Sequence, residues 1–179
     1  METSRDKVQE KPIRLIAAVC NNMGIGKDGK LPWHLPSEFQ YFLNTVMKVS
    51  RPGKMNMMIW GKLCWYSHPE NMFPLANILH VVLSTTLKTV PDHAHFLCQD
   101  FESAIRLAAQ PPLADLIETI WIVGGTQVYK AIRDLAIQSH QGALLFWSSR
   151  CQQRARTEWS ESKRRTRKSE TKTKESHDL

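Results

Sequence analysis

A single carboxylate stands at the start of an otherwise apolar helix pattern, and it is the side chain in this sequence best suited to chemistry. Glu38 is one of two acids between Pro12 and Pro69, and the other, Asp28, belongs to an Asp-Gly pair typical of turns. Apolar side chains recur after Glu38 at helical spacing: Phe39, Phe42, Leu43, Val46 and Met47. A carboxylate in that first turn, with Trp33 close in sequence, predicts a site that grips a small cationic or amide-edged ring.

A second candidate site is the run from residue 120 to 130, in which an apolar strand pattern leads through Gly124-Gly125 into a helix pattern. Glycines let a backbone approach a ligand closely, and a helix start offers unpaired N–H groups to a phosphate. The run lacks the third glycine of a dinucleotide-binding fingerprint, so an ordinary turn is an equally open interpretation. Lys62 follows another predicted strand and is either a second phosphate contact or a solvated lysine.

Composition and charge favour one globular domain with a polar tail. The chain has 179 residues and a net charge of +7. Residues 150–179 hold ten Lys or Arg and five Asp or Glu, so most of that charge lies in the tail. The body therefore lacks a basic patch for nucleic acid, and the tail lacks interleaved aromatic residues. Nucleic-acid binding by the tail is the weaker alternative to a disordered, solvated segment.

The cysteines and the N-terminal residues favour a cytoplasmic protein. Cys20, Cys64, Cys98 and Cys151 form no Cys-x-x-Cys pair, which argues against a zinc site and for reduced thiols. The first twelve residues are polar and lack the apolar run of a signal peptide. No stretch approaches the roughly 18 apolar residues that a membrane-spanning helix needs. We expect neither a bound metal nor membrane association.

The elements that must position these residues follow from the apolar spacing. Strands are predicted over residues 13–20, 55–60, 78–84, 94–98, 119–123 and 142–147. Helices are predicted over 37–49 with Ser37 as N-cap, after Asp100 as a second cap, and over 126–134. This alternation predicts an α/β fold with an open, mostly parallel central sheet flanked by helices. We expect a polar arm over 1–12, one domain over 13–149 and a basic tail over 150–179.

Four runs in this chain resemble the dihydrofolate reductase family, in its animal form, in order, spacing and chemistry. They read MGIGKDGKLPW, SEFQYF, GKLCWYSHPE and IWIVGGTQVYK. The similarity covers roughly residues 13–130, and its most specific part is Leu-Pro-Trp followed shortly by Glu-Phe. The resemblance implies reduction of 7,8-dihydrofolate to tetrahydrofolate by NADPH, with hydride added at pterin C6 and a proton at N5.

The resemblance also implies roles for individual residues. Glu38 would hydrogen-bond the pterin amino and ring N–H edge, and Trp33 would hold a water that relays the proton. Leu31, the third residue of this catalytic group, would pack on the pterin and benzoyl rings. The implied substrate-binding residues are Ile16, Ala18, Glu38, Phe39, Phe42, Met72, Leu75, Ile78, Val123 and Ser148. The implied cofactor-binding residues are Ala18, Gly24, Ile25, Gly26, Lys27, Asp28, Gly29, Lys30, Lys62, Leu63, Cys64, Ser84, Thr85, Thr86, Gly124, Gly125, Thr126, Gln127, Val128 and Tyr129. For the aromatic members, an ordinary core role coexists with the implied one.

Four positions depart from the family pattern. Ile78 replaces an arginine that grips the substrate's α-carboxylate, which predicts binding weaker by roughly 2–4 kcal/mol and a lower KM in Ile78→Arg. Cys64 replaces a threonine and is a poorer hydrogen-bond donor. Met72 replaces an asparagine, and Thr85 replaces a basic residue that contacts the 2′-phosphate, which weakens the expected preference for NADPH over NADH.

The C-terminal region departs further. The family's final strands are expected to be missing, with Ser148 near the place of a family threonine. An impaired enzyme and a non-catalytic relative that binds folate and NADPH are both consistent with these changes. In either case we expect a monomer with a small-molecule partner, dihydrofolate.

Overall fold

The structure is a computed structural model, and it describes residues 11–18, 25, 28, 30, 36–68, 70–139 and 144–147. The chain divides into two compact units. The first comprises residues 1–16 and 42–146 and holds the sheet with its core. The second comprises residues 17–41 and 147–179 and holds the beginning of the first helix.

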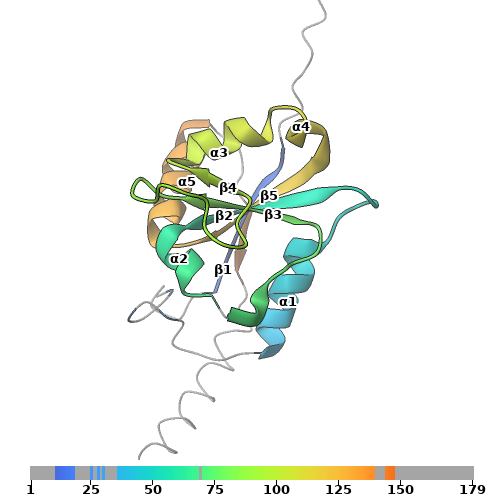
Figure 1. Cartoon of the computed structure of the whole chain (residues 1–179), viewed down its shortest axis with the longest axis horizontal. Coiled ribbons are helices and arrows are strands. Elements are labelled where there is room, and N and C mark those ends of the chain that lie inside the picture. Colours follow the sequence, from blue (N-terminus) through green and yellow to red (C-terminus); the bar gives the residue numbers. More distant parts are fainter. Residues whose placement is uncertain are drawn as a thin grey trace, which may run out of the picture. The chain divides into compact units, whose positions relative to one another are not determined.

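A six-stranded sheet organises the first unit (Figure 1). Its strands are β1 Ile13–Ala17, β2 Met55–Gly61, β3 Ile78–Leu83, β4 Phe96–Cys98, β5 Ile117–Gly124 and β6 Leu144–Trp147. They lie in the order β4-β3-β2-β5-β1-β6, and the pairs β1–β5, β2–β5, β2–β3 and β3–β4 are parallel. The predicted α/β class with a mostly parallel sheet is confirmed.

Five α-helices and one 3₁₀ turn are described. They are α1 Pro36–Met47, α2 Lys62–Tyr66, η1 Glu70–Met72, α3 Phe101–Ala108, α4 Leu113–Leu116 and α5 Thr126–Ser139. Helix α5 packs on β5 and β2, α2 packs on β2 and β3, and α3 contacts β4 and α4 (Figure 1). The side chain of Asp100 caps α3 by accepting from the Ser103 N–H at 2.7 Å, as predicted.

The central strands are mostly apolar because helices and loops cover both faces of a parallel sheet. In β2 every residue from Asn56 to Trp60 is buried, and β3 and β5 are nearly as enclosed. One core cluster combines Ile16, Val46, Met58, Trp60, Trp65, Met72, Ile78, Val82 and Trp121. The short apolar runs that predicted these strands are therefore the core itself.

Several element boundaries differ from those predicted. Strand β1 ends at Ala17, β3 ends at Leu83, β4 begins at Phe96, and β5 is longer than predicted at both ends. Helix α1 begins at Pro36, so Ser37 is a helical residue and not the N-cap; proline fits the first turn because its missing N–H is not needed there. Helix α5 continues past the predicted end at residue 134 to Ser139.

The polar arm and the tail fall mostly outside the described residues. Of residues 1–12 the structure describes Lys11 and Pro12, and it describes none of 150–179. The predicted strand over 142–147 is confirmed over Leu144–Trp147, next to β1 in the sheet. The family's final strands, which we expect to be missing, would follow β6, and that part of the chain lies outside the described residues.

Candidate functional site

Close backbone contact marks the carboxyl ends of β2 and β5. A Cβ atom added to Gly61 would lie 3.2 Å from both the Gly125 nitrogen and Val128 Cγ2, so a side chain there would require these neighbours to shift by a few tenths of an ångström. Gly124 has φ +127°, a conformation that favours glycine, and its Cβ would lie 3.2 Å from Cys64 Sγ and from the Tyr129 hydroxyl oxygen. Gly125, joined to Gly124 by a cis peptide, has open space where a Cβ would be.

Two neutral side chains hold this glycine region in place. The Cys64 thiol donates a weak hydrogen bond to the Val123 carbonyl at 3.7 Å, and the Tyr129 hydroxyl donates to the Ile16 carbonyl at 3.0 Å. Burial raises the pKa of Cys64 to about 11. Burial, followed by the neighbouring Cys64, also raises the pKa of Tyr129. Both groups keep their protons at neutral pH and serve to join β1, β5, α2 and α5.

A cation and two hydroxyls lie at the ends of the neighbouring strands. Lys62, the first residue of α2, donates from Nζ to Thr86 Oγ1 at 2.8 Å. The Ser84 hydroxyl accepts from the N–H groups of Thr86 and Leu87, both at 3.1 Å, which shapes the turn after β3. Because β2, β3 and β5 are parallel, this turn, Lys62 and the glycines all lie at the carboxyl ends of the strands. Ligands bind at that end of the sheet in open α/β folds.

The remaining predicted cofactor residues around these groups differ in exposure. Val128 is buried, whereas Thr126 and Gln127, at the start of α5, are exposed. Thr85 is exposed in the turn after β3, and Leu63 is 85% exposed on α2. Helix α5 begins directly after Gly125, whose carbonyl accepts the N–H groups of Val128 and Tyr129 at 3.0 and 3.1 Å. The N–H groups of Thr126 and Gln127 have no partner within the helix.

The predicted substrate-binding residues of the first unit belong to one apolar cluster. Ile16, Met72 and Ile78 are buried in it, while Phe42, Leu75 and Val123 pack against it. Ile78 is 2% exposed at the first position of β3, where it fills core space. Ile78 therefore has a core packing role that was not predicted, and a charged replacement must compete with that packing.

The predicted residues of the second unit are described only in part. Glu38 lies in the first turn of α1 and is half-buried, and Phe39 beside it is 36% exposed. Ala18 and Ile25 are half-buried, and Lys30 is exposed. Asp28 is exposed with φ 53°, which agrees with its predicted turn role. Seven predicted residues lie outside the described residues: Gly24, Gly26, Lys27, Gly29, Leu31, Trp33 and Ser148.

Two features of this region were not predicted. The Gly61 contact was missed, although a glycine directly before Lys62 at the end of an apolar run was a signal for close approach. His80 was missed as well: it is 2% exposed on β3, and its Nδ1 accepts from Trp60 Nε1 at 3.1 Å. A histidine within the apolar run of β3 was the available signal, but its partner depends on strand register.

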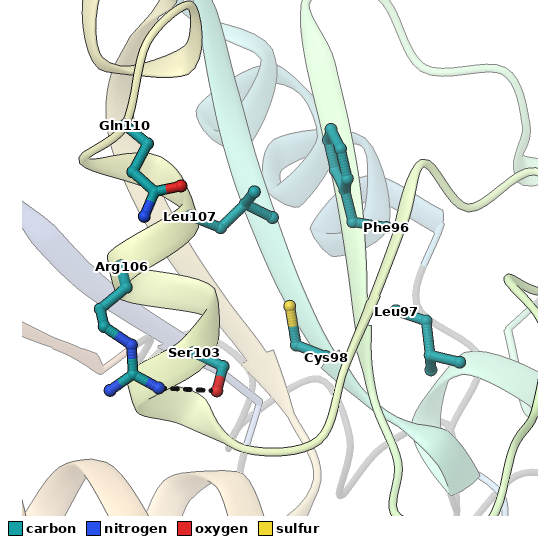
Figure 2. A pocket seen from close by; sticks show the side chains of 7 residues that line it. All are labelled: Phe96, Leu97, Cys98, Ser103, Arg106, Leu107 and Gln110. Carbon is teal, nitrogen blue, oxygen red and sulfur yellow. Dashed lines mark hydrogen bonds between the residues drawn. The ribbon is translucent and has the colours of Figure 1, made fainter.

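An open hollow of about 320 Å³ lies elsewhere, between β4 and α3 (Figure 2). Phe96 and Cys98 point toward α3, while Leu97 points away, as alternation along a strand requires. On the helix side Arg106 donates to the Ser103 hydroxyl at 3.0 Å. None of the predicted site residues lines this hollow.

Comparison with known proteins decides the family. The family model described as dihydrofolate reductase matches residues 12–179. The chain belongs to the dihydrofolate reductase family. The pig (Sus scrofa) dihydrofolate reductase is 45% identical over 121 residues, covering 67% of this chain and 65% of the pig protein. The chicken (Gallus gallus) dihydrofolate reductase is 43% identical over 128 residues, covering 71% of this chain and 68% of that protein.

A solved structure agrees with this assignment. The dihydrofolate reductase of Schistosoma mansoni has a TM-score of 0.63 and 26% identity, covering 77% of this chain and 72% of that one. The chain spans about 65% of the length of the pig and mouse (Mus musculus) relatives. The predicted dihydrofolate reductase resemblance and fold are thus confirmed.

Among the described residues, no group of three or more His, Cys, Asp or Glu side chains is arranged to hold a metal ion. Within the same part of the chain, no helix combines the length and apolar character needed to cross a membrane.

Proposed function

We propose that this member of the dihydrofolate reductase family reduces 7,8-dihydrofolate to tetrahydrofolate with NADPH. The proposal takes the reaction from the relatives that carry the name dihydrofolate reductase. The single observation in the structure that supports it best is the close backbone contact of Gly61 with Gly124 and Gly125 at the ends of β2 and β5. This contact lies beside the hydrogen bond from Lys62 to Thr86.

The residues at the carboxyl ends of β2, β3 and β5 fit a dinucleotide. Gly125 leaves open space beside the start of α5, whose first N–H groups and positive dipole end suit a phosphate. Lys62 supplies a positive charge at the neighbouring strand end, and the Thr86 and Ser84 hydroxyls supply further polar contacts. When bound, NADPH supplies the hydride that the reduction requires.

At the substrate end, the proposal takes the role of each residue from the family resemblance. Glu38 would hold the pterin amino and ring N–H edge, and Trp33 would position the water that delivers the proton. Phe42, Leu75 and Val123, which pack against the core cluster, would offer apolar surface to the pterin and benzoyl rings. Fixed groups of this kind contribute by aligning two rings and managing one proton.

We further propose that the protein acts as a cytoplasmic monomer. Cys64 and Cys98 are free thiols, which suits a reducing compartment. Size-exclusion chromatography with light scattering tests the monomer, because a dimer would elute at twice the chain's mass of 20.6 kDa.

The reaction is tested by following the absorbance of NADPH with and without dihydrofolate. Oxidation that requires dihydrofolate and stops with an antifolate is the expected result. NADPH that binds without being oxidised would instead identify a non-catalytic relative, and failure to bind NADPH at all would overturn the proposed cofactor site.

A further inference from the structure

His80 is a buried histidine surrounded by aromatic rings from four segments. Its ring centroid lies 5.9 Å from that of Trp60, 5.4 Å from Trp65, 4.8 Å from Phe73 and 5.7 Å from His95. The side chain is 2% exposed. The ring therefore lies in dry, close-packed surroundings in which an unpaired polar atom, and above all a charge, costs free energy.

The hydrogen bonds of His80 define its protonation. An indole N–H can only donate, so His80 Nδ1 accepts from Trp60 Nε1 at 3.1 Å and carries no proton. The neutral ring therefore has its proton on Nε2, which is buried with no hydrogen-bond partner among the described residues. The pair forms only with a neutral imidazole.

A second proton is incompatible with this arrangement. It would place an N–H on Nδ1 facing the N–H of Trp60, so that two donors meet. Burial, followed by the nearby His95 and His68, lowers the pKa of His80 to about 3. Among the described residues, the charges that act on His80 are therefore imidazoles that oppose its protonation: His95 just before β4 and His68 just after α2. His93 lies across Phe73, with ring centroids 5.7 Å apart.

The rings around His80 also connect the strands whose ends carry Gly61 and Gly124. Trp60 lies beside Gly124 in the register of β2 and β5, and beside Val82 in that of β2 and β3. His95 holds the backbone of His80 from the other side: its Nδ1 accepts the His80 N–H at 3.0 Å, and its own N–H donates to the His80 carbonyl at 2.9 Å. Movement of Trp60 would reach Gly61 and Gly124 directly.

We propose that His80 and Trp60 form a proton-sensitive lock that positions the carboxyl end of β2 for nucleotide binding and opens locally on acidification. His80 is a positioning residue, since it acts through Trp60 and the strand. The inference rests on the proposed function only in naming NADPH as the ligand.

Amide hydrogen exchange tests the lock in the full-length chain, with protection factors corrected for intrinsic rates at each pH. His80→Asn keeps an acceptor for Trp60 and cannot titrate, whereas His93→Asn removes an exposed histidine near the cluster and is the matched control. In the parent and in His93→Asn, protection of residues 57–60 should fall about tenfold per pH unit below about pH 6.5. In His80→Asn this fall should be absent.

Residues 13–15 of β1 report whether opening is local. They should keep their protection while residues 57–60 lose it, and saturating NADPH should restore protection to residues 57–60. Equal loss in both segments, or no effect of bound NADPH, would overturn the lock. If NADPH does not bind at neutral pH, the proposed function fails, and the exchange measured without nucleotide still decides whether the lock exists.

A measurement on the parent protein covers the case in which His80→Asn does not fold. NMR titration of the imidazole protons should show His80 neutral down to below pH 5, well under the ordinary histidine value of about 6.5. Titration of His80 near that ordinary value in the folded protein would contradict the lock.

Discussion

At the scale of single residues, the two adjacent glycines at the end of β5 have different reasons to be glycine. Gly124 has a positive φ, and a Cβ there would crowd Cys64 and Tyr129, whereas Gly125 has open space where a Cβ would be. Conformation and packing therefore require the first glycine, while ligand approach is the reason that the proposed function gives for the second.

Alanine substitutions separate these two roles. Gly124→Ala should lower the free energy of unfolding by about 1–3 kcal/mol because it combines backbone strain with contacts at Cys64 and Tyr129. Gly125→Ala should change stability by less than about 0.5 kcal/mol but weaken NADPH binding about tenfold or more. Urea unfolding and fluorescence titration measure the two quantities. Unchanged NADPH affinity in Gly125→Ala would contradict a cofactor phosphate at this position.

Ile78 is the residue at which packing and proposed binding conflict. Because the side chain belongs to the core cluster, Ile78→Arg should destabilise the fold by about 3 kcal/mol or more, while Ile78→Val should cost about 0.5–1.5 kcal/mol. Where the arginine variant remains folded, its KM for dihydrofolate should fall, because the guanidinium gains a carboxylate partner. Steady-state kinetics, under conditions in which the variant stays folded, measures this KM. An unchanged KM rejects the assigned role.

At the scale of elements, one buried amide joins the end of α1 to two strands. Asn56 on β2 donates to the Val46 and Lys48 carbonyls at 2.7 and 2.9 Å, and its Oδ1 accepts the Thr119 N–H at 3.1 Å. The two carbonyls at and after the end of α1 need such donors because a helix leaves its last carbonyls without internal partners. A polar residue within the β2 run thus has a structural reason.

Removal of that amide should loosen the attachment of α1. Asn56→Ala leaves three buried or partly buried backbone groups without their partner, so the free energy of unfolding should fall by about 2–4 kcal/mol. Asn71→Ala, at an exposed position in η1, is the control and should change stability by less than about 0.5 kcal/mol. Equal urea midpoints for the two variants would mean that Asn56 does not anchor α1.

The local sequence predicted the helices and strands better than the contacts between them. The apolar runs of β2, β3 and β5 and the Asp100 cap were readable because strand burial and capping depend on a few adjacent residues. Helix α4 was missed because four residues after Pro111-Pro112 carry no periodic pattern. The bonds of Asn56 and of His80 were not predictable, since they depend on register between strands distant in the chain.

At the scale of the whole molecule, the parallel order of β3, β2 and β5 brings together residues that lie some 60 positions apart in sequence, such as Cys64 and Val123. The cofactor site at Gly124-Gly125 and Lys62 follows from the sequence, and it stays a prediction. The strand order itself came only from the structure, because crossover connections leave no local signal. Of the proposed catalytic group, Glu38 is described and lies at the start of α1.

The most direct test of the proposed reaction is dihydrofolate-dependent oxidation of NADPH by the parent chain and by Glu38→Ala. Glu102→Ala, which removes an exposed acid from α3, is the matched control. The parent and Glu102→Ala should oxidise NADPH only when dihydrofolate is present, and Glu38→Ala should be slower by about 10²–10⁴-fold while still binding NADPH. Equal rates in Glu38→Ala and the parent would contradict the proposed role of the carboxylate, and with it the mechanism proposed for this chain.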